Sequence, residues 1–124
     1  MDSRVRSAIV IAALLAYATP ALAQEACVEP TAPAPISGTA VTGDQLRAAM
    51  ADARGFITQS NIYQDCLHHE LEAARTQAGT EGHPLDPAME SSVKTRIAAS
   101  QQAQDRVSQT VNTALTTYKQ VHPN

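Results

Sequence analysis

The chain has 124 residues with 12 acidic and 9 basic side chains, and the formal net charge of −3 disfavours nucleic acid as a partner, because a phosphate backbone calls for a basic surface. It has no Trp, one Phe and three Tyr, which are too few aromatic side chains for a surface that stacks bases. A chain of this length accommodates one small domain.

The first 23 residues have the organisation of a secretory signal peptide. Arg4 and Arg6 precede an apolar run over residues 8–18, and small residues at Ala21 and Ala23 supply a cleavage signal. The run is shorter than the roughly 20 residues that span a bilayer. We therefore expect export to the periplasm, cleavage after Ala23, and no integral membrane segment in the mature chain.

Residues 24–41 are predicted to form a proline-rich arm. Prolines such as Pro30 and Pro33 lack a backbone N–H and favour an extended, polyproline-like conformation. On a helical wheel, Gly55 and Cys66 share one flank of the helix that follows, and the arm is long enough to reach back to Cys66. We expect the arm to lie along this flank, with Gly55 admitting its backbone closely.

The chain has two cysteines, Cys27 and Cys66. In an oxidising compartment such a pair forms a disulfide by default, and closing a loop of about 40 residues contributes about 4 kcal/mol in the chain-entropy model. Lipidation of Cys27 would require an aliphatic residue three positions earlier, where Gln24 stands instead. The sequence therefore predicts a Cys27–Cys66 disulfide.

A long helix is predicted to begin at Thr42. Its side chain and that of Gln45, three residues later, fit a capping box. We expect the helix to fade between Thr76 and Gly79. Apolar or small residues recur along it at steps of three and four: Leu46, Met50, Ala53, Ile57, Ser60, Tyr63, Leu67, Leu71 and Ala74.

A turn rich in Gly and Pro over residues 79–84 separates this helix from a second one. Asp86 followed by Pro87 is typical of a helix start, with Asp as the cap and Pro at the first position. The second helix is expected to end near Gln120. Its stripe consists of Met89, Val93, Ile97, Ser100, Gln104, Val107, Val111, Leu115 and Tyr118.

Two long helices joined by a short turn predict an all-α, antiparallel hairpin over residues 42–124. Folding the chain about the turn pairs positions whose numbers add up to about 164. Leu67 then meets Ile97, and Leu71 meets Val93. The predicted fold is this hairpin, with the proline-rich N-terminal arm pinned to it by one disulfide.

The middle of the predicted seam is polar. Ser60 is expected to face Gln104, and Tyr63 or Gln64 to face Ser100. A polar layer inside an apolar seam usually fixes the register of the helices. The alternative is that these residues form a ligand or partner site.

Histidine and acidic residues near the turn offer a weak metal site. His69, Asp65 and His83 are one candidate ligand set, and His68 with Glu72 is another. Adjacent helical histidines point about 100° apart, and the sequence has no HExxH or paired-Cys motif. Solvated pairs between residues four apart explain the same side chains, so we expect no metal and no other cofactor.

Catalytic arrangements are missing from the sequence. It shows no Ser/His/Asp set and no glycine-rich phosphate loop. A narrow seam between two helices is also not expected to enclose a pocket of several hundred cubic ångströms. We therefore expect no enzymatic activity and no catalytic residues.

Several short motifs carry a resemblance across most of the mature chain. They are CVEP at residues 27–30, Phe56 with Ile57, YQDCL at 63–67, PLDP at 84–87, and Tyr118 with Lys119 and His122. This pattern resembles a group of small exported proteins of unknown function from alphaproteobacteria. The resemblance implies a periplasmic helical hairpin with a disulfide, and it supplies no catalytic residues.

The sequence thus favours a non-enzymatic interaction or structural protein of the periplasm, whose partner is a second copy or another envelope protein. The alternative is a periplasmic stress protein, either chaperone-like or metal-buffering. Residues 41–45 resemble the LTxxQ motif of periplasmic stress chaperones, but a capping box alone produces that pattern.

Overall fold

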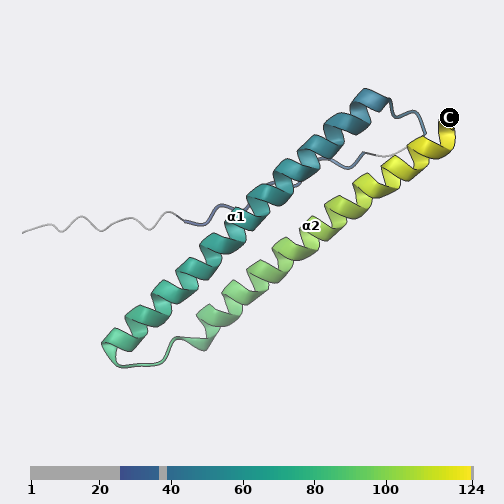
Figure 1. Ribbon diagram of the computed structural model, residues 1–124. Helices are drawn as coiled ribbons and strands as arrows, with labels where there is room; N and C mark the ends of the chain where they lie inside the picture. Colours follow the sequence, from purple (N-terminus) through teal and green to yellow (C-terminus); the bar gives the residue numbers. More distant parts are fainter. Residues whose placement is uncertain (1–25, 37–38, 124) are drawn as a thin grey trace, which may run out of the picture.

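The computed structural model describes residues 26–36 and 39–123, which form a hairpin of two long helices with the N-terminal arm beside it (Figure 1). Helix α1 spans Gly43–Glu81 and helix α2 spans Pro87–Val121. The predicted all-α hairpin with an arm pinned by one disulfide is confirmed. The expected signal peptide, residues 1–23, lies outside the described residues.

Both helices begin at the predicted caps. The Thr42 hydroxyl accepts a hydrogen bond from the Gln45 N–H at 3.2 Å, and the Gln45 side-chain oxygen accepts one from the Thr42 N–H at 2.9 Å. At α2, Asp86 accepts from the Ala88 N–H at 2.9 Å, and Pro87 occupies the first turn. These side chains satisfy backbone donors that the first turn of a helix leaves free.

The end of α1 differs from the expectation. The helix does not fade between Thr76 and Gly79 but continues to Glu81 and ends at Gly82, whose φ of 77° is left-handed. The Gly82 N–H donates to the carbonyls of Ala78 and Gly79. A left-handed residue terminates a helix and favours Gly, so the second glycine of the turn ends α1 rather than the first.

The core lies along the seam in two clusters separated by serines. Near the turn, the buried residues are Tyr63, Leu67, Leu71 and Val93. Toward the open end of the hairpin, where α1 begins and α2 ends, they are Ala53, Phe56 and Val107. Ser60 and Ser100 are buried between the two clusters. Burial of apolar side chains in this seam is the main force that holds the two helices together.

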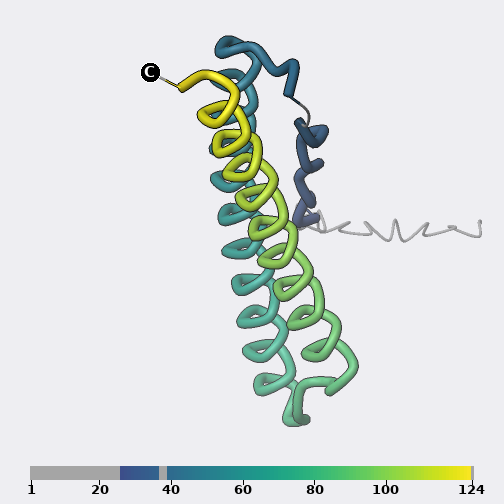
Figure 2. The backbone as a smooth tube through the Cα atoms, turned by 90° about the vertical axis from the view of Figure 1, so that its right-hand side faces the viewer, coloured from purple at the N-terminus to yellow at the C-terminus, as the bar shows by residue number. Residues whose placement is uncertain are grey.

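The register of the two helices agrees with the prediction. Leu71 and Val93 belong to one buried cluster, and Ile97 packs against it. The side-chain amide of Gln64 donates to the Ser100 hydroxyl at 3.0 Å. The two helices run side by side along their whole length in both views (Figures 1 and 2).

Three buried apolar residues, Phe56, Ala78 and Ala114, were missing from the predicted stripes, and Phe56 is the largest of them. Phe56 is buried, with 5% of its surface exposed, whereas the predicted Ile57 is half-buried. Phe56 lies in a cluster with Ala53 and Val107. On a helical wheel Phe56 lies about 100° from Ile57, so the seam is centred closer to Phe56 than the stripe implied.

The polar middle of the seam is present, but its expected pairing is not. The Ser60 hydroxyl is fully buried and has no hydrogen-bond partner among the described residues. The Gln104 amide instead donates to the Ile57 carbonyl at 3.2 Å and to the Asn61 side chain at 2.8 Å. Ser60 therefore contributes a buried polar atom without a compensating bond, which is unfavourable.

Replacing Ser60 with Ala is expected to stabilise the hairpin by about 1 kcal/mol, because it removes an unsatisfied buried hydroxyl. Ser100→Ala is the matched control, and it should destabilise by about 1 kcal/mol because the Gln64 amide loses its acceptor. Urea unfolding followed by circular dichroism measures both changes. Equal destabilisation by the two substitutions would contradict this account.

The arm contacts the hairpin with one residue in three. Cys27, Pro30, Pro33 and Ile36 are half-buried, and the residues between them are exposed. A polyproline helix has three residues per turn, so one edge of an extended arm faces the helices. The arm runs alongside the half of the hairpin that includes the open end (Figure 2).

The prediction that the backbone of the arm packs closely against Gly55 is wrong. No atom lies within 4 Å of the position that a Cβ of Gly55 would take. The arm instead shares a groove with both helices, including Ala49 of α1 and Ala103 of α2. Packing between two helices covers more apolar surface than packing on the flank of one.

Gly55→Ala is therefore expected to stabilise the protein by about 1 kcal/mol, because an exposed helical Gly has a high entropic cost and here has no packing role. Gly82→Ala is the control, and it should destabilise because residue 82 has a positive φ. Thermal unfolding of both variants tests this. A destabilised Gly55→Ala protein would show that the arm does approach this flank.

Candidate functional site

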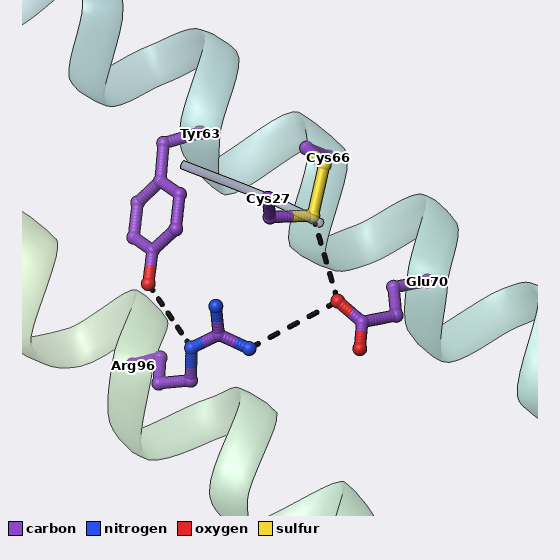
Figure 3. Close-up of a disulfide and its surroundings, with 5 residues drawn as sticks. All are labelled: Cys27, Tyr63, Cys66, Glu70 and Arg96. Carbon is purple, nitrogen blue, oxygen red and sulfur yellow. Dashed lines mark hydrogen bonds and ion pairs between the residues drawn. A yellow bond between two sulfur atoms is a disulfide. The ribbon is translucent and has the colours of Figure 1, made fainter. Parts of the chain in front are cut away.

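The disulfide joins the arm to the middle of α1 (Figure 3). Cys27 and Cys66 are bonded with a Cα–Cα distance of 5.7 Å, as the sequence predicts. Both residues are half-buried, and Cys27 packs against the buried cluster that includes Tyr63. The bond therefore fixes the start of the described arm against the seam.

Arg96 of α2 links the two helices beside the disulfide (Figure 3). Its Nε donates to the Tyr63 hydroxyl at 3.0 Å, and its guanidinium carbon lies 5.5 Å from the centre of the Tyr63 ring. Its Nη1 lies 3.9 Å from Oε2 of Glu70, and the same carboxylate oxygen lies 3.5 Å from Sγ of Cys27. The sulfur contact is not a hydrogen bond, since a disulfide sulfur has no hydrogen to donate.

The sequence reasoning did not identify this group. The predicted register places Arg96 opposite His68, within one helical turn of Glu70 and little more than one turn from Tyr63. The register therefore places Arg96 near both residues, but none of the predicted pairs across the seam included Arg96. An exposed-looking Arg on a helical flank gives no further indication that it reaches a tyrosine on the neighbouring helix.

An open groove of about 780 Å³ lies beside the disulfide. Its lining combines apolar side chains with acidic, basic and histidine side chains. The lining residues are Ala26, Cys27, Ile62, Asp65, Cys66, His69, Glu70, Ala73 and Arg96. A protein contact surface usually combines apolar and polar side chains in this way.

The structure does not bring the candidate metal ligands together. Asp65 and His69 line the groove, but α1 continues to Glu81, so His83 lies beyond a further 12 helical residues, or about 18 Å of helix. Within residues 26–36 and 39–123, no group of three or more His, Cys, Asp or Glu side chains is arranged to hold a metal ion.

His83 instead bonds within the turn. Its Nδ1 lies 3.0 Å from the Pro84 carbonyl oxygen and its Nε2 lies 2.7 Å from Oε2 of Glu81. The bond to the Pro84 carbonyl, and then that to Glu81, raise the pKa of His83 above 6.5. Hydrogen bonds from Gln77 and from His83 lower the pKa of Glu81.

These shifts predict a pH dependence with a defined sign. Because the pKa of His83 is raised in the folded protein, its contribution to stability is present at low pH and is lost as pH rises through that pKa. An NMR titration of the His83 ring should give a pKa above 6.5, and Glu81→Gln should lower it. A pKa at or below 6.5 in the parent protein would contradict the two bonds.

No protein-family model, curated protein or solved structure matches this chain. Among the described residues, neither helix combines the length and the apolar character that crossing a membrane requires.

Proposed function

We propose that this protein is a non-enzymatic interaction protein of the periplasm, and that it binds its partner through the apolar surface beside the disulfide. One observation carries the proposal. Val28 and Ile62 are the most exposed of the large apolar side chains in the described part of the chain, at 82% and 65%, and they flank the Cys27–Cys66 bond.

Each of these two side chains lies close to one of the two bonded cysteines. Val28 directly follows Cys27, and Ile62 lies one helical turn before Cys66 on the same flank of α1. Because the bond already fixes the arm to the helix, binding a partner costs little further conformational entropy. A surface that is pre-organised in this way binds more tightly. The charged side chains that line the groove, Asp65, Glu70 and Arg96, supply polar contacts for such an interface.

The same bond supports the proposed compartment. Disulfides persist in oxidising compartments and are rare in the cytosol. The basic, apolar and small-residue pattern of residues 1–23 is that of a signal peptide. Together, the disulfide and this pattern support export to the periplasm.

Site-specific photo-crosslinking in cells tests the proposal. A photo-reactive amino acid at position 62 should give a discrete adduct in the periplasmic fraction. Position 121 is the matched control, because Val121 is also an exposed apolar residue, at 45%, but lies at the end of α2. An adduct of twice the chain mass would identify a second copy, and any other mass would identify another envelope protein.

The proposal predicts adducts at position 62 and none at position 121. The absence of an adduct at 62, or the same adducts at both positions, would overturn it. Ile62→Lys provides a second measurement, since a charge at the centre of the surface should prevent formation of the complex without altering the helical hairpin.

A further inference from the structure

We propose that the groove between the arm and the two helices binds a fatty acid with an alkyl chain of about twelve carbons, with this chain under the arm and its carboxylate on Arg106. This inference goes beyond the proposed interaction function and rests on different residues. It concerns the half of the hairpin toward the open end, along which the arm runs (Figure 2), and the lining of this groove shares no residue with that of the groove beside the disulfide.

The groove exists because the arm adds a third wall to the hairpin. The two-helix seam was not expected to enclose a pocket of several hundred cubic ångströms, and within the described residues it does not, but the arm and both helices together line an open groove of about 500 Å³. This volume lies within the range of about 300–1,000 Å³ of small-molecule sites. The apolar lining residues are Ala32, Pro33, Ala34, Pro35, Ile36, Ala48, Ala49, Ala103, Val107 and Val111.

The chemistry of these walls favours an alkyl chain. Small side chains such as Ala48, Ala49 and Ala103 leave the space open. Pro33 and Pro35 have no backbone N–H, so this stretch of the arm has fewer donors for a polar ligand. A ligand rich in hydrogen-bonding groups would lose its bonds to water without replacement, whereas an alkyl chain loses none.

The lining becomes polar in one direction. A second hollow of about 440 Å³ shares Ile36, Arg106 and Thr110 with the groove. It continues along α2 past polar side chains, among them Gln109, Thr113 and Thr117. A continuous site that is apolar at one end and polar at the other matches a molecule with an apolar chain and a polar head.

Arg106 indicates that the polar head of this molecule is negatively charged. Its guanidinium forms no ion pair within the described residues, and it is the one charged side chain that lines the second hollow. Arginine binds carboxylates through two parallel hydrogen bonds. Asp52 lines only the apolar groove, so repulsion by its carboxylate directs an acidic head toward Arg106.

Binding of dodecanoate by the mature, oxidised protein tests the inference. We expect saturable binding of one dodecanoate per chain below its micelle-forming concentration, measured by titration calorimetry and by NMR shifts of the Val107 and Val111 methyl groups. Dodecanol has the same chain without the charge, and it should bind about tenfold more weakly, as expected for the loss of a bond to a charged group.

Two variants separate the head from the chain. Arg106→Gln should bind dodecanoate no more tightly than dodecanol. Ala48→Phe should fill the groove and weaken binding of both ligands at least tenfold, whereas Ala98→Phe, at an exposed position of α2 outside the groove, should bind both like the parent. Circular dichroism establishes that each variant is folded.

Three results would overturn the inference: no binding of dodecanoate to the parent, equal affinity of Arg106→Gln and the parent for dodecanoate, or equal effects of Ala48→Phe and Ala98→Phe. Each is independent of the crosslinking at position 62. A protein that fails to bind dodecanoate but forms the crosslink would retain the proposed interaction function, and the reverse result would retain the groove alone.

Discussion

Replacing Cys66 with Ser is expected to lower the free energy of unfolding by about 4 kcal/mol, because the bond closes a loop of 39 residues that an unfolded chain would otherwise sample freely. The loss is large because a small domain has a total stability of about 5–15 kcal/mol. Urea unfolding of the oxidised parent and of the variant measures the difference.

The same substitution should release the arm. Apart from Cys27, the half-buried residues of the described arm before Val41 are Pro30, Pro33 and Ile36, which is little apolar surface to hold an extended segment. Limited proteolysis should therefore cut the variant within residues 32–40 and leave the oxidised parent intact there.

The double variant with Ser at both Cys27 and Cys66 is the control for the stability effect. It should unfold at nearly the same urea concentration as Cys66→Ser, because the second change removes no further bond. An unchanged stability in Cys66→Ser, or a resistant arm, would mean that contacts of the arm alone hold it in place.

Leu67→Ala should destabilise the hairpin by about 2–5 kcal/mol, the range for removing a large buried aliphatic side chain. Leu67 is fully buried, at 0% exposure, in the cluster with Tyr63 and Leu71. Thermal unfolding followed by circular dichroism measures the loss.

Ile62→Ala is the matched control for Leu67→Ala. Ile62 is an aliphatic residue of the same helix, but 65% of its surface is exposed, so its truncation should change stability by no more than about 0.5 kcal/mol. If Ile62→Ala destabilised the protein as much as Leu67→Ala, Ile62 would be buried in solution, and a self-associated form would have to be considered in place of the single hairpin.

The local signals in the sequence were sufficient for most of the fold. Thr42 with Gln45, and Asp86 with Pro87, define helix starts through bonds between residues three positions apart or fewer, so no tertiary information is needed to find them. The register followed from the turn and the two stripes, because a short connection restricts how antiparallel helices align.

The errors arose where the answer depends on tertiary packing. The period-three pattern of the arm indicates which of its own edges faces the helices but not which part of the hairpin it faces, so its position over Ala49 and Ala103 rather than Gly55 could not be read from its own sequence. The groove that it forms was missed for the same reason. The end of α1 was misplaced because Gly79 and Gly82 are equivalent as sequence signals, and only Gly82 takes a positive φ.

The candidate site was predicted in part. The Cys27–Cys66 bond followed from the number of cysteines and the expected compartment, but the contacts of Arg96 with Tyr63 and Glu70 depend on how long side chains bend across the seam. The weak metal candidates His69, Asp65 and His83 are not brought together, because α1 continues to Glu81 and carries His83 away from His69.

The central claim is that Cys27 and Cys66 of one chain are bonded and thereby pin the arm to the hairpin. Mass spectrometry of protein isolated from the periplasm, with free thiols alkylated under non-reducing, denaturing conditions, tests it most directly. We predict a single chain without alkylation, lighter than its reduced form by two hydrogen atoms, and a digest in which the Cys27 and Cys66 peptides are joined. Two alkylated cysteines, or a bond found only between two chains, would contradict the account.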